Sequence, residues 1–171
     1  MKIVLLGYMG SGKSTVGKLL AEALEIPFLD LDDYIEKIEE QSIANIFAQK
    51  GEIYFRKKEA ASLRKVLSRA EDLVLSIGGG TPCYANNMQA ISEITNDVFY
   101  LKASISKLVN RLSKEKSERP LIKNFDDEEL PEFIGKHLFE RSFYYSQAEH
   151  NIQCDNMNPS EIVKEIKTLL S

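Results

Sequence analysis

Short apolar runs alternate with amphipathic stretches along the whole chain. The first run covers residues 3–6, is unbroken and ends at Gly7, which is typical of a strand buried on both faces. From Val16 the apolar positions recur at helical spacing, and Pro27 ends that helix. Four later runs predict further short strands, at residues 28–31, 73–77, 98–101 and 152–154.

Helical patterns fill the intervals between these strands. Ser42 and Gly51 mark boundaries between helices, and Asn158 with Glu161 forms a capping box at the start of the last helix. The alternation predicts an α/β fold, a three-layer α/β/α sandwich around a five-stranded parallel sheet, with ligands at the carboxyl ends of the strands. The predicted helices after the first cover residues 33–40, 42–50, 52–69, 86–94, about 102–112, 128–147 and the C-terminus.

Residues 112–127 differ from the rest of the chain. Charged residues dominate 114–119, an acidic run covers 126–129, and little in between is expected to join a core. Such a segment is typical of a mobile, solvated lid. We therefore expect a lid at about residues 112–127 within a single domain of residues 1–171.

Composition and charge narrow the class of protein. The chain has 22 Lys+Arg and 26 Asp+Glu, a formal net charge of −4, which argues against a general nucleic-acid binder. The two cysteines are too few for a disulfide framework, and no apolar run approaches the ~20 residues of a membrane span. The N-terminal apolar run is also too short for a signal peptide. We expect a soluble, cytoplasmic protein that binds neither nucleic acid nor membrane.

The clearest motif is a phosphate-binding loop between the first strand and the first helix. Residues 7–14, Gly-Tyr-Met-Gly-Ser-Gly-Lys-Ser, fit the pattern G-x-x-x-x-G-K-[ST]. Its glycines permit a backbone curl whose N–H groups converge on a phosphate, and the helix N-terminus adds partial positive charge. Lys13 is expected to reach the outer phosphates, and the Ser14 hydroxyl to bind Mg²⁺. The motif predicts a nucleoside triphosphate site.

Two carboxylates follow the second predicted strand. Asp30 and Asp32 are expected to end that strand two residues apart, so both side chains would point the same way, into the cleft beside the phosphate loop. Such a pair can hold a hydrated Mg²⁺ and accept a proton from an attacking hydroxyl. The alternative is that these acids cap the next helix. For Asp33 the capping interpretation is favoured, because residues 33–36 have a capping-box arrangement.

Other candidate residues remain ambiguous from the residues alone. Glycines 78–80 leave bare backbone where a substrate could approach closely, although an ordinary loop is the alternative. Arg56 and Arg141 are either surface ion-pairing residues or ligand contacts, and the aromatic residues beside Arg141 are expected in the core. Arg119 in the lid suggests a cation delivered over the phosphates, against a merely solvated charge. The two histidines and two cysteines are assigned no catalytic role.

Taken together, these motifs resemble those of the shikimate kinase family. The resemblance runs from Lys2 to the final helix, and the ordered set with its intervals is more specific than the phosphate loop alone. A departure is the stretch 155–158, which lacks a basic residue that many members have near the adenine. The segments that carry the resemblance are 7–15 (GYMGSGKST), 28–32 (FLDLD), 42–47 (SIANIF), 51–56 (GEIYFR), 75–80 (LSIGGG), 98–101 (VFYL), 119–121 (RPL) and 140–145 (ERSFYY).

The resemblance implies a P-loop NTPase fold of the nucleoside monophosphate kinase type, and transfer of the ATP γ-phosphoryl group to the shikimate 3-hydroxyl. It implies a helical substrate-binding region at about residues 32–62, a step in aromatic amino-acid biosynthesis, and a monomer. The implied catalytic residues are Asp32, Lys13 and Arg119. Nucleotide contacts are implied for Gly10, Ser11, Gly12, Lys13, Ser14, Thr15, Arg111 along the adenine, and Arg119. Shikimate contacts are implied for Asp32, Arg56, Gly78, Gly79, Gly80 and Arg141, and Mg²⁺ contacts for Ser14 directly and Asp30 through water.

Two other functions stay open. The phosphate loop does not name the acceptor, so another small-molecule or nucleoside monophosphate kinase is possible, although two arginines and a glycine triplet favour a carboxylated polyol over a second nucleotide. A nucleotide-binding regulatory module without catalysis is the alternative from a different class.

Overall fold

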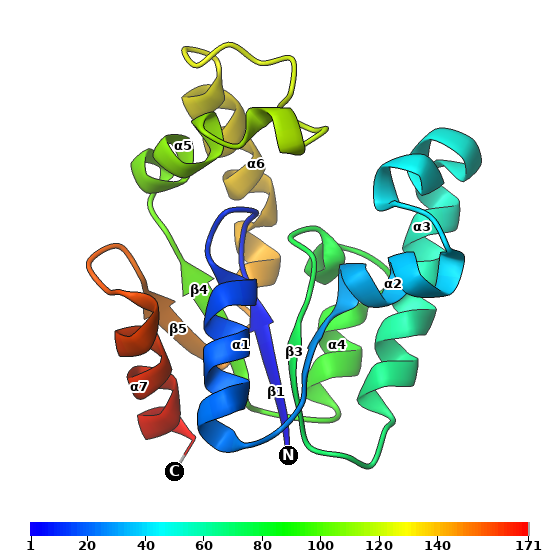
Figure 1. The fold of residues 1–171 in the computed structure, drawn as a ribbon, viewed down its shortest axis with the longest axis vertical. Coiled ribbons are helices and arrows are strands. Elements are labelled where there is room, and N and C mark those ends of the chain that lie inside the picture. The colour runs from blue at the N-terminus through cyan, green and yellow to red at the C-terminus, as the bar shows by residue number, and fades with distance from the viewer. Residues whose placement is uncertain (171) are drawn as a thin grey trace.

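Five parallel strands form the central sheet of the computed structural model, which describes residues 1–170 (Figure 1). Their order is β2-β3-β1-β4-β5, and every neighbouring pair is parallel. In the centre of the sheet Val4 pairs with Leu75 on one side and with Val98 on the other. The predicted five-stranded parallel sheet is therefore confirmed. The strands are β1 (Lys2–Leu6), β2 (Phe28–Asp30), β3 (Leu73–Ser76), β4 (Val98–Lys102) and β5 (His150–Gln153).

Helices cover both faces of this sheet. Because side chains alternate along a strand, Ile3 and Leu5 share one core cluster with residues of α1 and α7, whereas Val4 and Leu6 share another with residues of α3 to α6. This is the predicted three-layer α/β/α arrangement. No helix in residues 1–170 is long and apolar enough to cross a membrane. The helices are α1 (Lys13–Leu24), α2 (Leu31–Glu39), α3 (Ile43–Leu67), α4 (Asn87–Ser92), α5 (Ile105–Ser113), α6 (Leu130–Tyr145) and α7 (Pro159–Leu169).

The predicted helix boundaries are confirmed where a cap or a glycine sets them. Ser42 caps α3 by accepting a hydrogen bond from the backbone N–H of Asn45. Gly51 interrupts α3 with φ 82° and ψ 171°, so the two predicted helices are two segments joined at a kink. Asn158 and Glu161 form the predicted capping box of α7.

The junction of β2 and α2 differs from the prediction. The strand ends at Asp30 and the helix begins at Leu31, so Asp30 and Asp32 are not two residues of one strand. The N-cap is Asp30, because its carboxylate accepts hydrogen bonds from the N–H groups of both Asp32 and Asp33. The predicted capping box at Asp33 is therefore wrong. The helix begins two residues earlier than predicted. Leu31 explains this, because its fully buried side chain packs in the same core cluster as residues of the sheet.

The lid sequence is less solvated than predicted. Its charged residues are largely exposed, including the run 126–129, but Ile122 is fully buried in the same cluster as Leu108 and Leu130. The Phe125 ring packs against Phe133, with ring centroids 4.5 Å apart. The prediction that little in this segment joins a core is wrong, because Ile122 packs in one cluster with residues of α5 and α6, the two helices that the segment connects (Figure 1).

The aromatic residues beside Arg141 also differ from the prediction. Phe139 is 82% exposed and Phe143 is exposed as well, so neither belongs to the core. They are four residues apart on α6 and share its outward face, whereas Arg141 and Tyr145, also four apart, share the face that is turned to the sheet. Tyr145 is the aromatic residue of this stretch that is fully buried.

Replacing Ile122 tests whether the lid is anchored. Ile122→Ala is expected to lower the free energy of unfolding by about 2–5 kcal/mol, because it leaves a cavity in a close-packed cluster. Leu121→Ala is the matched control. The Leu121 side chain is 61% exposed, so its truncation should change the free energy of unfolding by about 0.5 kcal/mol or less. Denaturant unfolding measures both. Equal effects of the two substitutions would contradict the anchoring.

Candidate active site

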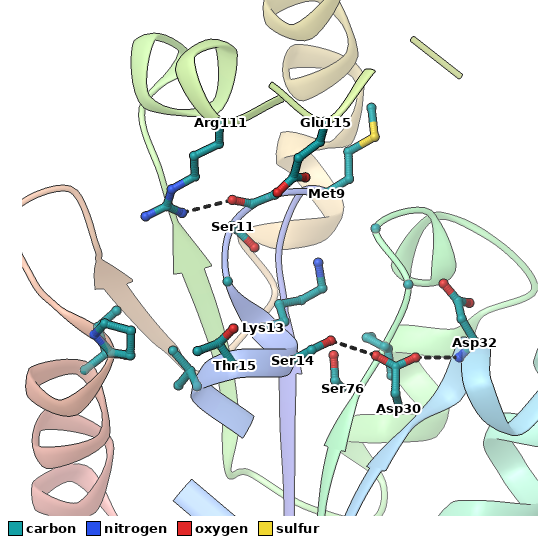
Figure 2. Close-up of a pocket in the computed structure, with 18 of the residues that line it drawn as sticks. Met9, Ser11, Lys13, Ser14, Thr15, Asp30, Asp32, Ser76, Arg111 and Glu115 are labelled. Carbon is teal, nitrogen blue, oxygen red and sulfur yellow. Dashed lines mark hydrogen bonds between the residues drawn. The ribbon is translucent and has the colours of Figure 1, made fainter. Parts of the chain in front are cut away.

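A cavity of about 520 Å³ opens at the carboxyl ends of β1, β2 and β3 (Figure 2). This is the edge of a parallel sheet at which α/β proteins bind their ligands. The cavity brings together the phosphate loop, the start of α2, the end of β3, the lid and the start of α7. Of the predicted site residues it is lined by Gly10, Ser11, Gly12, Lys13, Ser14, Thr15, Asp30, Asp32, Gly78, Gly79, Arg111 and Arg119.

The phosphate loop has the predicted backbone curl. Gly10 and Gly12 have φ angles of 78° and 94°, left-handed values that glycine adopts without steric cost. Gly12 is the N-cap of α1, so unpaired N–H groups of the first turn are directed to the cavity. The Lys13 ammonium donates hydrogen bonds to the carbonyl oxygens of Gly7 at 2.8 Å and Tyr8 at 3.0 Å. This loop is built to hold an anion.

The Lys13 ammonium is poorly solvated. Removal from water lowers its pKa from 10.5 to about 8, while the nearby carboxylates of Asp32 and Asp30 partly oppose that shift. Since desolvation penalises the isolated charge, an anionic ligand that contacts Lys13 would raise its pKa again. The Lys13 ammonium therefore has carbonyl groups, and no anion, as its hydrogen-bond partners at the position where phosphates would lie.

Asp30 joins the helix cap to the phosphate loop. One of its oxygens caps α2, and the other accepts a hydrogen bond of 2.9 Å from the Ser14 hydroxyl (Figure 2). The structure thus supports both readings of Asp30 offered by the sequence, a helix cap and a cavity residue. Within residues 1–170, no cluster of three or more His, Cys, Asp or Glu side chains could hold a metal ion. The hydroxyl of Ser14 and the carboxylate of Asp30 nevertheless suit Mg²⁺, which prefers oxygen ligands and keeps several waters and phosphate oxygens around it.

Asp32 lies in the first turn of α2, with its carboxylate in the cavity (Figure 2). Burial and the charges of Asp30 and Glu59 raise its pKa from 3.8 to about 7, although Lys13 lowers it in part. A Cβ atom at Gly78 would lie 3.1 Å from Asp32 Oδ1. The bare backbone of Gly78 therefore leaves room for a carboxyl group that can gain or lose a proton near neutral pH.

The other two glycines of the triplet face the two candidate arginines. A Cβ atom at Gly79 would lie 3.0 Å from Arg141 Nη1, and one at Gly80 would lie 2.8 Å from Arg56 Nη2. Asp32, Arg56 and Arg141 come from three different helices, and the structure brings all three against consecutive glycines. This close approach explains why the chain has three glycines where one would make a turn.

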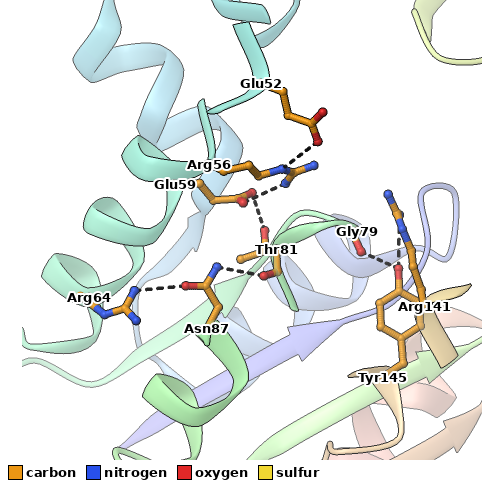
Figure 3. Close-up of polar contacts among 9 residues, drawn as sticks. All are labelled: Glu52, Arg56, Glu59, Arg64, Gly79, Thr81, Asn87, Arg141 and Tyr145. Carbon is orange, nitrogen blue, oxygen red and sulfur yellow. Dashed lines mark hydrogen bonds and ion pairs between the residues drawn. The ribbon is translucent and has the colours of Figure 1, made fainter. Parts of the chain in front are cut away.

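Arg56 is held by a buried carboxylate that the sequence analysis missed. The Arg56 side chain is 17% exposed, and its Nη1 donates a 2.8 Å hydrogen bond to Glu59, which is 1% exposed (Figure 3). The other oxygen of Glu59 accepts a 2.7 Å hydrogen bond from the Thr81 hydroxyl, and Glu52 lies 3.7 Å from Arg56 Nε. The spacing of three residues between Arg56 and Glu59 could have indicated the pair, but not its burial. Arg56 is thus ion-paired, as one reading of the sequence held, yet it is turned to Gly80 rather than to bulk solvent.

Tyr145 is a second missed residue. Its hydroxyl donates a 2.6 Å hydrogen bond to the carbonyl oxygen of Gly79 and lies 3.5 Å from Arg141 Nη1 (Figure 3). Tyr145 follows Arg141 by one helical turn, which is the only signal of it in the sequence. The contact fixes the orientation of the Gly79 peptide beside Arg141.

The lid side of the cavity carries the remaining arginines. Arg111 Nη1 donates a 2.9 Å hydrogen bond to the carbonyl oxygen of Gly10 in the phosphate loop. Arg119 Nε donates a 2.9 Å hydrogen bond to Glu115 Oε2, and Nη2 of Arg119 lies 2.9 Å from the same oxygen in an ion pair. The apolar side chain of Met157 lines the same cavity, in the stretch that lacks the expected basic residue. The structure therefore places both Arg111 of α5 and the lid residue Arg119 at the cavity.

Three comparisons with known proteins agree with this geometry. A family model described as shikimate kinase matches residues 9–171. A shikimate kinase from Flavobacterium johnsoniae is 52% identical over 170 residues, which is 99% of each chain. Two solved structures superpose over 99% of this chain. The shikimate kinase from Bacteroides thetaiotaomicron has a TM-score of 0.92, 34% identity and 98% of its own chain covered. The enzyme from Acinetobacter baumannii, solved in complex with shikimate, has a TM-score of 0.89, 32% identity and 92% of its chain covered.

These matches extend across the sheet, both helical layers and the cavity, and they confirm the predicted P-loop NTPase fold. With a matching family model and a relative above half identity over nearly its whole length, the chain belongs to the shikimate kinase family.

Proposed function

We propose that the chain transfers the γ-phosphoryl group of ATP to the 3-hydroxyl of shikimate, giving shikimate 3-phosphate and ADP. Membership of the family makes it an ATP-dependent kinase with an alcohol acceptor. The observation that carries the acceptor is the convergence of Asp32, Arg56 and Arg141 on glycines 78–80 beside the phosphate loop. One carboxylate and two guanidinium groups suit a hydroxylated carboxylic acid.

The nucleotide half of the site would use backbone groups and three cations. The N–H groups of residues 10–15 would bind the β- and γ-phosphates, and the Lys13 ammonium would exchange its carbonyl contacts for phosphate oxygens. Arg111 would lie along the adenine, opposite Met157. Arg119 would leave Glu115 and contact the transferred phosphoryl group as the lid at about residues 112–127 closes and excludes water.

Mg²⁺ fits beside this half of the site. Ser14 would bind it directly and Asp30 through water, because their oxygens already lie 2.9 Å apart at the edge of the phosphate loop. When bound, the ion neutralises charge on the β- and γ-phosphates.

The acceptor half would orient the hydroxyl for in-line attack. Arg56 and Arg141 would bind the shikimate carboxylate, for which the planar guanidinium fork is well suited. The Gly79 N–H would donate to a substrate hydroxyl, since Tyr145 holds that peptide in place. Asp32 would accept a hydrogen bond from the attacking hydroxyl and take its proton, which its raised pKa favours near neutral pH. The helical region 32–62 supplies Asp32 and Arg56.

We propose that the protein acts in the cytoplasm as a monomer. Both cysteines are free thiols, in keeping with the cytoplasm.

Acceptor-dependent ADP release tests the proposal against its alternatives. Shikimate, gluconate and AMP are offered in parallel with ATP and Mg²⁺, and only shikimate is expected to stimulate release. Stimulation by gluconate or AMP alone would contradict the acceptor assignment. No stimulation by any acceptor would favour a nucleotide-binding regulatory module.

Arg56→Ala should weaken shikimate use far more than nucleotide binding. Loss of a charged, forked hydrogen-bond donor is expected to raise the KM for shikimate by about 10- to 100-fold, with nucleotide affinity nearly unchanged. Arg69→Ala is the matched control, because Arg69 forms its ion pair with Glu71. Because Arg56→Ala also leaves the buried carboxylate of Glu59 without its cationic partner, thermal unfolding is measured in parallel. Equal losses for both substrates would contradict the role.

Asp32→Asn should slow phosphoryl transfer by about 10²-fold or more, because the amide does not accept a proton. In the wild type, kcat/KM for shikimate should rise with pH through about 7, as Asp32 loses its proton, and the variant should lack this rise. The folded-state pKa lies above the unfolded value of 3.8, so stability falls as pH rises between the two values. Above pH 7, Asp32→Asn should therefore unfold at a higher temperature than the wild type. A loss of turnover in a variant that is at least as stable would come from the missing carboxylate and not from unfolding. Near-wild-type turnover would remove Asp32 from the mechanism.

Gly80→Ala should displace Arg56. The backbone at Gly80 has φ −89° and ψ −15°, which alanine adopts freely, so the effect comes from a Cβ atom 2.8 Å from Arg56 Nη2. We expect the KM for shikimate to rise by about 10- to 100-fold. Gly135→Ala on α6 is the control, because its Cβ atom would lie 3.4 Å from Ile105 in ordinary contact. Unchanged shikimate kinetics in Gly80→Ala would contradict the proposal that Arg56 binds the shikimate carboxylate from its position beside Gly80.

A further inference from the structure

The ring of Tyr84 lies over the guanidinium group of Arg56. The Arg56 Cζ atom is 4.0 Å from the ring centroid, well within the range of a favourable cation–π contact. Tyr84 is 38% exposed, so its ring is not there to fill the core. The acceptor mechanism above assigns it no role.

The two residues after Tyr84 have a left-handed backbone conformation. Ala85 and Asn86 follow it with φ angles of 52° and 54°, and a left-handed conformation costs about 1–2 kcal/mol for a residue such as alanine. Consecutive strained residues persist only where the surroundings impose them, and such strain is common at functional sites.

Surrounding side chains impose this conformation. Arg64 of α3 donates hydrogen bonds to the carbonyl oxygen of Ala85 at 2.9 Å and to Asn87 Oδ1 at 3.2 Å (Figure 3). Asn87, which is fully buried, donates to the carbonyl oxygen of Thr81 at 2.9 Å. The segment 81–87 is therefore held at both ends, with Tyr84 between them.

We propose that Tyr84 is a positioning residue for the acceptor: its ring holds the Arg56 guanidinium plane in the orientation that binds the shikimate carboxylate. This inference rests on the proposed function, in which Arg56 contacts that carboxylate.

Stacking suits this task because it uses no hydrogen-bond donor. Glu59 already takes Nη1 of Arg56. The exposed Glu52 lies 3.7 Å from Nε but accepts no hydrogen bond from it, and Nη2 faces Gly80. A further carboxylate or carbonyl group that accepted a hydrogen bond from the guanidinium would consume the donors that the substrate needs. An aromatic face restricts the long, flexible side chain and leaves those donors free, which lowers the entropic cost of binding.

Steady-state kinetics of three Tyr84 variants test the proposal. Tyr84→Ala and Tyr84→Leu both remove the ring, and Leu keeps apolar volume in case Ala impairs folding. Both are expected to raise the KM for shikimate by about 2- to 30-fold, the range of one cation–π contact, with the KM for ATP and kcat within about twofold of wild type. Tyr84→Phe keeps the ring and should restore the wild-type KM.

Two controls separate positioning from general structure. Phe139→Ala removes an exposed ring on α6 and should change neither KM. Ala85→Gly relieves the left-handed strain and should leave the KM for shikimate unchanged while stability is retained. A wild-type KM in Tyr84→Ala and Tyr84→Leu would overturn the proposal, as would an equal loss in Tyr84→Phe. Absence of shikimate-dependent turnover in the wild type would overturn the proposed function itself.

Discussion

The buried carboxylate of Glu59 is the constraint on which the acceptor side of the molecule depends. An ionised carboxylate that is 1% exposed is strongly destabilising unless it is paired and hydrogen-bonded. Its partners are Arg56, one turn earlier on α3, and Thr81, which follows the glycine triplet after β3. A single desolvated group thereby joins the long helix to the sheet edge. It also restricts the movement of Arg56, so the pairing that satisfies Glu59 at the same time holds the Arg56 guanidinium group against Gly80.

What the sequence predicted well is local. The strand runs, the capping box at Asn158 and the phosphate loop each depend on residues within one or two turns of each other. The capping box and the loop are as predicted, and all five strands lie where they were predicted, although their bounds differ by one or two residues. Ile122 was misjudged because isolated apolar residues in a charged segment carry no periodicity. Its burial depends on packing with residues of α5 and α6, which no local pattern reveals. Asp32 was misjudged for a related reason, since a strand pattern placed it in β2, whereas Asp30 both ends the strand and caps α2 and the helix begins at the buried Leu31.

The same distinction applies to the candidate site. Motif spacing nominated Asp32, Arg56 and Arg141 one at a time, and nothing in the sequence states that each would lie against one glycine of a triplet. Glu59 and Tyr145 escaped detection because a Glu three residues after an Arg, and a Tyr four residues after one, are ordinary surface pairs on most helices. Only tertiary packing buries Glu59 beside Arg56 and Thr81, and only tertiary packing brings the Tyr145 hydroxyl to the carbonyl oxygen of Gly79.

The charges of the cavity are arranged as competing pairs that a substrate complex would rearrange. Lys13 contacts two carbonyl groups and Arg119 is paired with one oxygen of Glu115, while burial, together with the charges of Asp30 and Glu59, raises the pKa of Asp32 to about 7. Each cation thus has a weak partner that a polyphosphate would replace. Because Ile122 is fully buried whereas the Arg119–Glu115 pair beside it is partly exposed, the Arg119 side chain would exchange partners while the turn that carries it stays packed. A chain with a net charge of −4 can therefore bind two anions, since its few site cations are held by groups that give way.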